Sequence, residues 1–231
     1  MKPLPRTHGA EELLDSPTHD PQLLGESLAH VAAVNRWLGG RRALLRTLAP
    51  RLRDGLRILD VGTGSGDLPR AIARCARRRR ARVHITATDV HPQMRERAEA
   101  ECRGFPEITI ASADALALPF EPDRFDVVLL SMVLHHLDDD AAAAALREAA
   151  RVAPLVVVNE LHRTRVNHAG ARVLASTVWA GNPITRHDGP LSVLRAYQPA
   201  ELRALARAAG LRVLELRRRW FQRLVLVAGR A

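Results

Sequence analysis

A glycine-rich segment that directly follows an apolar run constrains the fold more than any other feature of this sequence. The apolar run ends at Val61, and Gly62, Gly64 and Gly66 follow at alternate positions. Glycines allow a tight backbone turn and a close approach by a ligand, because they have no Cβ atom. A helix that begins at Asp67 would present free N–H groups at its start, and these favour an anionic group. The segment therefore predicts a strand, a ligand-binding turn and a helix.

From Gly55 onward, short apolar runs alternate with helical patterns. The predicted strands span residues 56–61, 83–90, 108–111, 125–132 and 155–161, and the predicted helices between them span 67–80, 92–103 and 139–152. A helix over 199–209 and two closing strands, 211–216 and about 220–227, complete the pattern. Continuous apolar strands that alternate with helices indicate an α/β fold with a parallel sheet covered on both faces.

Two segments lie outside this alternation. Residues 1–54 show apolar residues at helical spacing, such as Leu24, Leu28 and Val31, and are predicted to form an N-terminal helical cap ahead of a ligand-binding domain at 55–231. Residues 163–197 contain several glycines and prolines and are too long for a plain connection. We expect them to form an inserted helix and loop, a lid over the site that precedes the sixth strand.

Three acidic residues lie at or just after the ends of the first three predicted strands: Asp60, Asp89 and Asp114. The glycine spacing differs from the G-x-G-x-x-G pattern of nicotinamide-binding proteins, because position 67 is Asp rather than Gly. Asp60 can receive a cationic amino group, Asp89 can accept both hydroxyls of a ribose, and Asp114 can accept an adenine amino group. One such acid alone is usually a helix cap or a loop residue. Three in register favour a site for S-adenosylmethionine (SAM).

In these features the chain resembles the class I SAM-dependent methyltransferases, over about residues 56–162. The later segments Phe125–Val128 and Leu134–Leu137 also stand where that family has motifs. The resemblance implies a doubly wound, Rossmann-like sheet of seven mostly parallel strands with an antiparallel last strand. It also implies the positions that bind the cofactor: Asp60, Gly62, Thr63, Gly64, Gly66, Asp89, Val90, Asp114, Ala115 and Ser131.

Histidines are the candidate catalytic bases, because a hydroxyl nucleophile benefits from a base that titrates near neutral pH. His187 is the first candidate, since Asp188 beside it would orient the imidazole, although a turn built by residues 188–190 explains Asp188 equally well. His135 and His162 follow the predicted fourth and fifth strands, where a packing role or a loop salt bridge is about as plausible. The expected substrate contacts are Arg36, His136, Glu160 and Arg186. No metal site is expected, because Cys75 and Cys102 lack metal-ligand spacing.

The formal net charge of +10 raises the question of nucleic-acid binding. The basic residues are almost all arginine and are scattered, which is typical of a GC-rich genome, and the densest run, 77–80, falls at a predicted helix end. We therefore expect no nucleic-acid partner. No apolar stretch approaches the length of a membrane span, and the N-terminus does not look like a signal peptide. The sequence therefore predicts a cytoplasmic protein, either a monomer or a homodimer.

The resemblance is strongest to the small-molecule branch of the family, which includes quinone-biosynthesis and natural-product methyltransferases. It implies O-methylation of a phenolic, quinone-like or polyketide-like acceptor. C-methylation of a quinone precursor, RNA methylation and a catalytically silent SAM-binding module are the alternatives. Residues 131–134 lack the Asn-Pro-Pro-Tyr motif of enzymes that methylate nitrogen in DNA or in protein glutamine. This difference favours oxygen or carbon as the methylated atom.

Overall fold

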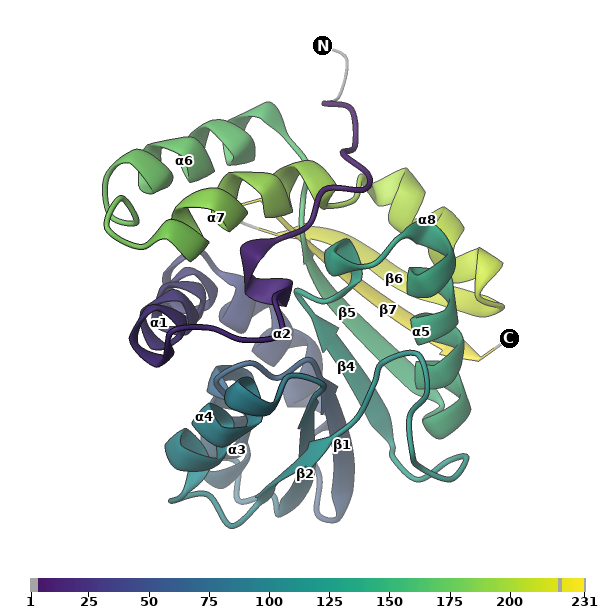
Figure 1. The fold of residues 1–231 in the computed structure, drawn as a ribbon. Coiled ribbons are helices and arrows are strands. Elements are labelled where there is room, and N and C mark those ends of the chain that lie inside the picture. The colour runs from purple at the N-terminus through teal and green to yellow at the C-terminus, as the bar shows by residue number, and fades with distance from the viewer. Residues whose placement is uncertain (1–3, 220–221, 231) are drawn as a thin grey trace.

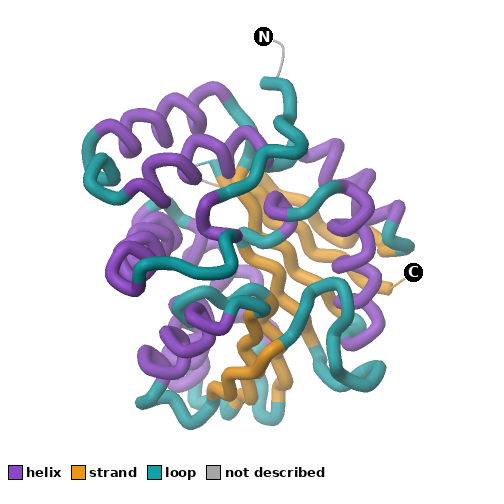
Figure 2. The backbone as a smooth tube through the Cα atoms, in the orientation of Figure 1, coloured by secondary structure: helices purple, strands orange, loops and turns teal. Residues whose placement is uncertain are grey.

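A computed structural model describes residues 4–219 and 222–230 as a seven-stranded sheet with helices on both faces (Figures 1 and 2). The strands are β1 (Leu56–Val61), β2 (Val83–Asp89), β3 (Ile108–Ser112), β4 (Val127–Ser131), β5 (Leu155–Leu161), β6 (Leu211–Arg219) and β7 (Arg223–Arg230). Their order across the sheet is β3-β2-β1-β4-β5-β7-β6. Successive strands are added toward one edge of the sheet from β1 to β3 and toward the other edge from β4 onward. This switch in strand order between β1 and β4 creates the crevice in which ligands of such sheets bind.

The strand directions confirm the predicted doubly wound α/β fold. β1 pairs in parallel with β2 and with β4, β4 pairs in parallel with β5, and β7 runs antiparallel between β5 and β6. β4 is shorter than predicted, because the Phe125 N–H is bonded outside the sheet, to the carbonyl of Val152. Trp220, where the last strand was predicted to begin, lies outside the described residues, and β7 starts at Arg223.

The two faces of the sheet are buried under different helices. On one face, Leu56 and Ile58 pack with Leu44 of α2 (Gly40–Leu48) and with Ile72 of α3 (Asp67–Arg78). On the other, Leu59 and Val61 pack against α5 (Asp139–Val152) and α8 (Pro199–Ala208). Side chains alternate along a strand, so β1 serves both cores and needs its nearly continuous apolar sequence.

The segments outside the alternation gather over the carboxyl ends of the strands. α1 (Pro21–Trp37) packs on α4 (Pro92–Cys102) through Leu28 and Met94. The predicted insertion consists of two helices rather than one, α6 (Arg165–Ser176) and α7 (Pro183–Arg195), which lie side by side in Figure 1. The Thr164 and Asn182 side chains cap them by accepting the Asn167 and Thr185 N–H groups, so each helix has its own start signal.

Residues before α1 cross in front of α7 as an extended chain with one short turn, η1 (Leu13–Asp15) (Figure 1). The Asp188 carboxylate on α7 accepts the N–H groups of Leu13 and Leu14 at 2.8 and 2.9 Å. The N-terminal segment is thereby tied to the insertion. Among the described residues, no helix combines the length and the apolar character needed to cross a membrane.

Candidate active site

The glycine-rich turn after β1 has a backbone that only glycine fits well. Gly62, Gly64 and Gly66 all have positive φ angles, at 69°, 55° and 70°. A Cβ on Gly62 would lie 2.6 Å from Val133 Cγ2, and one on Gly66 would lie 2.7 Å from Cys102 Sγ. The absence of side chains therefore both permits the turn and lets the following loops close around it.

Buried carboxylates surround this turn. Asp60 and Asp89 are only 2% and 6% exposed, and Asp67 stands at the start of α3. Burial raises the pKa of Asp60 to about 7, and the negative charges of Asp67 and Asp89 add to the effect. Burial also raises the pKa of Asp67 and of Asp89. Such a group of acids is poorly stabilised by the protein alone, and it fits a ligand that carries positive charge, as the sulfonium and amino groups of SAM do.

Asp89 is held by the backbone of two loops. One carboxylate oxygen accepts the Gly64 N–H at 2.9 Å, and the other accepts the His91 N–H at 3.0 Å. These bonds fix the carboxylate beside the glycine turn, at the end of β2. The position is the one expected for a residue that binds a ribose.

One cavity of about 880 Å³ adjoins the turn, at the upper end of the ~300–1,000 Å³ typical of ligand pockets. Nine of the ten predicted cofactor-binding residues line this cavity: Asp60, Gly62, Thr63, Gly64, Asp89, Val90, Asp114, Ala115 and Ser131. Gly66 does not line it, because it lies against Cys102 at the start of α3. The Ser131 hydroxyl accepts a hydrogen bond from Asn159 at 2.8 Å, and the exposed Asp114 carboxylate accepts the Leu116 N–H.

The other side of the cavity is apolar and comes from α1, α6 and α7. Its walls include Val31 and Val34 from α1, Leu174 from α6, Val193 from α7 and Trp179 from the turn between α6 and α7. Arg223 is the only arginine among the described residues that line the cavity, and it is 1% exposed. Burial lowers the pKa of Arg223 to about 10. The cavity thus has two parts. We call the part lined by the glycine turn with Asp60, Asp67 and Asp89 the cradle, and the part lined by the apolar side chains of α1, α6 and α7 the chamber.

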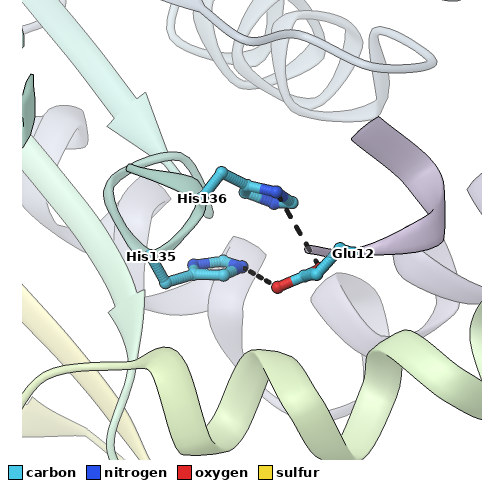
Figure 3. Close-up of side chains that lie close together, drawn as sticks. All are labelled: Glu12, His135 and His136. Carbon is cyan, nitrogen blue, oxygen red and sulfur yellow. Dashed lines mark ion pairs between the residues drawn. The ribbon is translucent and has the colours of Figure 1, made fainter. Parts of the chain in front are cut away.

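Between the two lies a group of three side chains, Glu12, His135 and His136, which we call the His–Glu cluster (Figure 3). The histidines belong to the turn η3 (Leu134–His136) after β4, and Glu12 comes from the N-terminal segment. His135 Nε2 lies 3.9 Å from Glu12 Oε1, and His136 Nδ1 lies 3.9 Å from Glu12 Oε2. All three residues line the cavity.

Carboxylates outside the cluster hold the two imidazoles. Glu160, which is fully buried, lies 2.7 Å from His135 Nδ1, and Asp15 lies 2.9 Å from His136 Nδ1. Burial alone would lower the pKa of His136, but the negative charges of Glu12, Asp15 and Glu160 outweigh it and raise that pKa to about 9. Burial alone would raise the pKa of Glu160, but the charge and the hydrogen bond of His135 outweigh burial, and the pKa of Glu160 is lowered.

Five of the other predicted residues, Glu160 among them, do not line the cavity. His187 is half exposed on α7, and its Nδ1 bonds to Asp188 at 2.7 Å. His162 is buried against Gln198, and burial lowers its pKa. The Arg36 guanidinium lies over the ring of Trp37, and Arg186 is exposed on α7. The structure therefore brings His135 and His136 to the cavity, whereas Glu160 reaches it only through His135.

Several cavity residues were not identified from the sequence. Asp67 and Asn35 line the cradle, where the Asn35 amide lies 3.5 Å from the Asp67 carboxylate. Glu12 and Asp15 reach the cavity from the N-terminal segment, which was predicted only to form a helical cap. Asp188 lines the cavity in place of its neighbour His187. The position of Asp67 directly after the third glycine could have identified it as a cradle residue. No pattern in the sequence around Glu12 indicates that it lies in the site.

Comparison with known proteins identifies the family. Residues 58–154 match the family model described as "Methyltransferase domain". The chain is 33% identical over 166 residues to a ubiquinone biosynthesis O-methyltransferase of Cereibacter sphaeroides, covering 71% of this chain and 63% of the relative. The chain belongs to the class I SAM-dependent methyltransferases. SAM is the methyl donor of this family.

Other relatives extend this picture. A ubiquinone/menaquinone biosynthesis C-methyltransferase of Rhizobium leguminosarum is 34% identical over 114 residues, covering 48% of this methyltransferase and 42% of the relative. This chain thus aligns with 42% to 63% of the length of these two curated relatives.

Solved structures share the fold at low identity. A SAM-dependent methyltransferase of Aquifex aeolicus superposes with a TM-score of 0.66 at 18% identity, covering 91% of this chain and 98% of that one. The [4+2]-cyclase SpnF also superposes with a TM-score of 0.66 at 18% identity, covering 100% and 99%. The fold alone therefore does not fix the reaction.

Proposed function

We propose that this protein transfers the methyl group of SAM to a hydroxyl of a small, largely apolar acceptor of the phenolic, quinone-like or polyketide-like class. The observation that carries the proposal is the single cavity in which the acidic cradle, the His–Glu cluster and the apolar chamber meet. The O-methyltransferase relative, which aligns with 71% of this chain, supports oxygen as the accepting atom.

In this proposal the cradle binds the cofactor. Asp60 and Asp67 face its positively charged amino group, Asp89 binds the ribose hydroxyls, and Asp114 with Ala115 lies beside the adenine. When bound, SAM supplies a methyl group on a sulfonium: the C–S bond breaks with its electron pair going to sulfur, while the acceptor oxygen forms the new C–O bond. Positioning the acceptor in line with that bond is the main catalytic task.

The chain's own residues position the acceptor and remove its proton. The apolar walls from α1, α6 and α7 hold the body of the acceptor and exclude water. The hydroxyl proton leaves toward the His–Glu cluster, where Glu160 fixes the orientation of His135 at 2.7 Å. An RNA acceptor is disfavoured, because the described walls of the chamber are mainly apolar and offer no exposed basic groove.

The test is a methylation assay on the purified protein with SAM and a set of phenols, each paired with its methyl ether, in which the hydroxyl is already blocked. We expect S-adenosylhomocysteine to form with the free phenols alone, and NMR to place the new methyl on oxygen. The Asp89→Ala variant should lose SAM binding, whereas Asp140→Asn, an exposed change on α5, should not. A new methyl on ring carbon would favour C-methylation, and turnover of RNA without turnover of any phenol would refute the proposal.

A further inference from the structure

We infer that Glu12, His135 and His136 form a binding site for one divalent first-row transition-metal ion of the zinc class. The site would lie in the cavity wall between the cofactor cradle and the apolar chamber. Two imidazoles and one carboxylate are a ligand set that such ions prefer. No local pattern in the sequence indicates this site, because Glu12 lies far from the histidines along the chain.

The distances suit one ion. The ligand atoms of the three residues all lie within 4.8 Å of one another, and Glu12 faces each imidazole at 3.9 Å. Zinc bonds of about 2.0–2.2 Å in a tetrahedral arrangement place ligand atoms about 3.3 Å apart. The pairs at 3.9 Å would have to approach by about half an ångström, and a pair at the 4.8 Å limit by about 1.5 Å, so side-chain movements alone would close the site around an ion.

An unpartnered buried oxygen points into the site. Glu12 is 3% exposed, and its Oε1 has no hydrogen-bond partner among the described residues, whereas Oε2 accepts a bond from the Ser192 hydroxyl at 2.8 Å. A buried carboxylate oxygen without a donor is costly, and native proteins rarely leave one unexplained. A metal ion is a partner of the right charge for this oxygen.

The orientation of His135 supports the same assignment. Its Nδ1 lies 2.7 Å from the fully buried carboxylate of Glu160, which is the usual partner of a metal-binding histidine. With the hydrogen on Nδ1, the lone pair of Nε2 faces the unpartnered oxygen of Glu12. Two electron-rich atoms then face each other with no hydrogen between them, and a cation would stabilise both.

The charges balance for a divalent ion. Three carboxylates, Glu12, Asp15 and Glu160, surround the imidazoles, and Arg195 is the cation beside Glu12, at 3.9 Å. An ion that binds His136 must first displace the proton that this imidazole holds near neutral pH. With both imidazoles neutral, two net negative charges remain. Asp15 contacts His136 Nδ1 at 2.9 Å, so coordination at that nitrogen would break this contact and leave the Asp15 carboxylate as a nearby negative charge.

With three protein ligands, an ion keeps a coordination position open, as catalytic zinc sites do. All three ligands line the cavity, so that position faces the chamber. If the proposed function holds, the open position would take the hydroxyl oxygen of the acceptor, lower its pKa and orient it toward the methyl group. In the metal-loaded protein the ion would then activate the hydroxyl in place of the imidazoles, because their free nitrogens would be ligands. The site itself does not depend on that function.

The test measures metal binding apart from activity. The full-length protein is stripped with EDTA, freed of chelator, and titrated with Co²⁺ by absorption spectroscopy and with Zn²⁺ against a chromophoric chelator. We expect one ion per chain, with a visible d–d spectrum of nitrogen and oxygen ligation. Glu12→Gln should weaken binding at least 100-fold, whereas Glu11→Gln, the exposed neighbour, should bind within twofold of the wild type.

His136→Asn is the second variant, since His136 is partly exposed and tolerates exchange better than a fully buried group. SAM affinity and the thermal midpoint confirm that each variant is folded. Absence of saturable binding by the wild type, or equal affinity in Glu12→Gln and Glu11→Gln, would overturn the site. Full methyl transfer after EDTA treatment would refute its catalytic role only, and metal binding without transfer to any acceptor would refute the proposed function and leave the site standing.

Discussion

If Asp60 binds the amino group of SAM as proposed, its buried carboxylate should make the binding of SAM dependent on pH. Burial, together with Asp67 and Asp89, raises the pKa of Asp60 to about 7 in the cofactor-free protein. The proposed contact with the amino group of SAM requires the ionised form. Cofactor binding should therefore be coupled to loss of a proton from Asp60.

The size of the effect follows from this pKa. With a pKa of about 7, Asp60 is ionised in about 3% of molecules at pH 5.5 and in about 75% at pH 7.5. The dissociation constant for SAM should therefore be about 25-fold larger at the lower pH. The sign is set by the raised pKa: the protonated form is the favoured one in the empty site, and affinity is lost as the pH falls below 7.

Calorimetry tests this coupling in two ways. The dissociation constant is measured between pH 5.5 and 7.5, and the heat at pH 7 is compared in buffers with different ionisation enthalpies. We expect release of about half a proton per bound SAM at pH 7. In Asp60→Asn, binding should be weak and nearly independent of pH, whereas Asp140→Asn should behave as the wild type. A flat profile in the wild type would refute the assignment of Asp60.

Three further changes test the glycine turn, the apolar chamber and the N-terminal segment. Gly62→Ala should lower the free energy of unfolding by more than ~2 kcal/mol, because φ is 69° and Val133 is too close for a Cβ. The control Gly210→Ala, at φ 76° with open space around the Cβ, should lower it by only about 1 kcal/mol of left-handed strain. Urea unfolding measures both values. Leu174→Trp should raise the KM for the acceptor more than tenfold and leave the SAM dissociation constant within twofold, whereas Arg172→Trp on the exposed side of α6 should change neither; an unchanged KM would place the acceptor elsewhere. Asp188→Ala should speed hydrogen exchange at the amides of Leu13 and Leu14 at least tenfold, because each amide loses a charge-assisted hydrogen bond of about 1.5–3 kcal/mol. Equal exchange rates in the wild type and the variant would show that other contacts hold this segment.

The fold and the cradle could be predicted from the sequence because their signals are local. Apolar runs mark the strands, and Gly62, Gly64 and Gly66 mark the turn whose backbone needs them. In a parallel sheet the carboxyl ends of neighbouring strands meet at one edge, so Asp60 and Asp89 had to lie close together once the strands were identified. No long-range information was needed for this half of the site.

The proposed catalytic half of the site depends on contacts that adjacency in the sequence does not reveal. Neighbouring residues on a helix point about 100° apart, so Asp188 faces the cavity while His187 faces solvent, and Asn35 faces the cradle while Arg36 does not. Two contacts with α7 bring Glu12 to the turn after β4: Asp188 holds the adjoining backbone of Leu13 and Leu14, and the Ser192 hydroxyl donates to the Glu12 carboxylate. The His–Glu cluster is therefore complete only while the N-terminal segment is docked, and under the proposed function this docking would complete the group that receives the acceptor's proton.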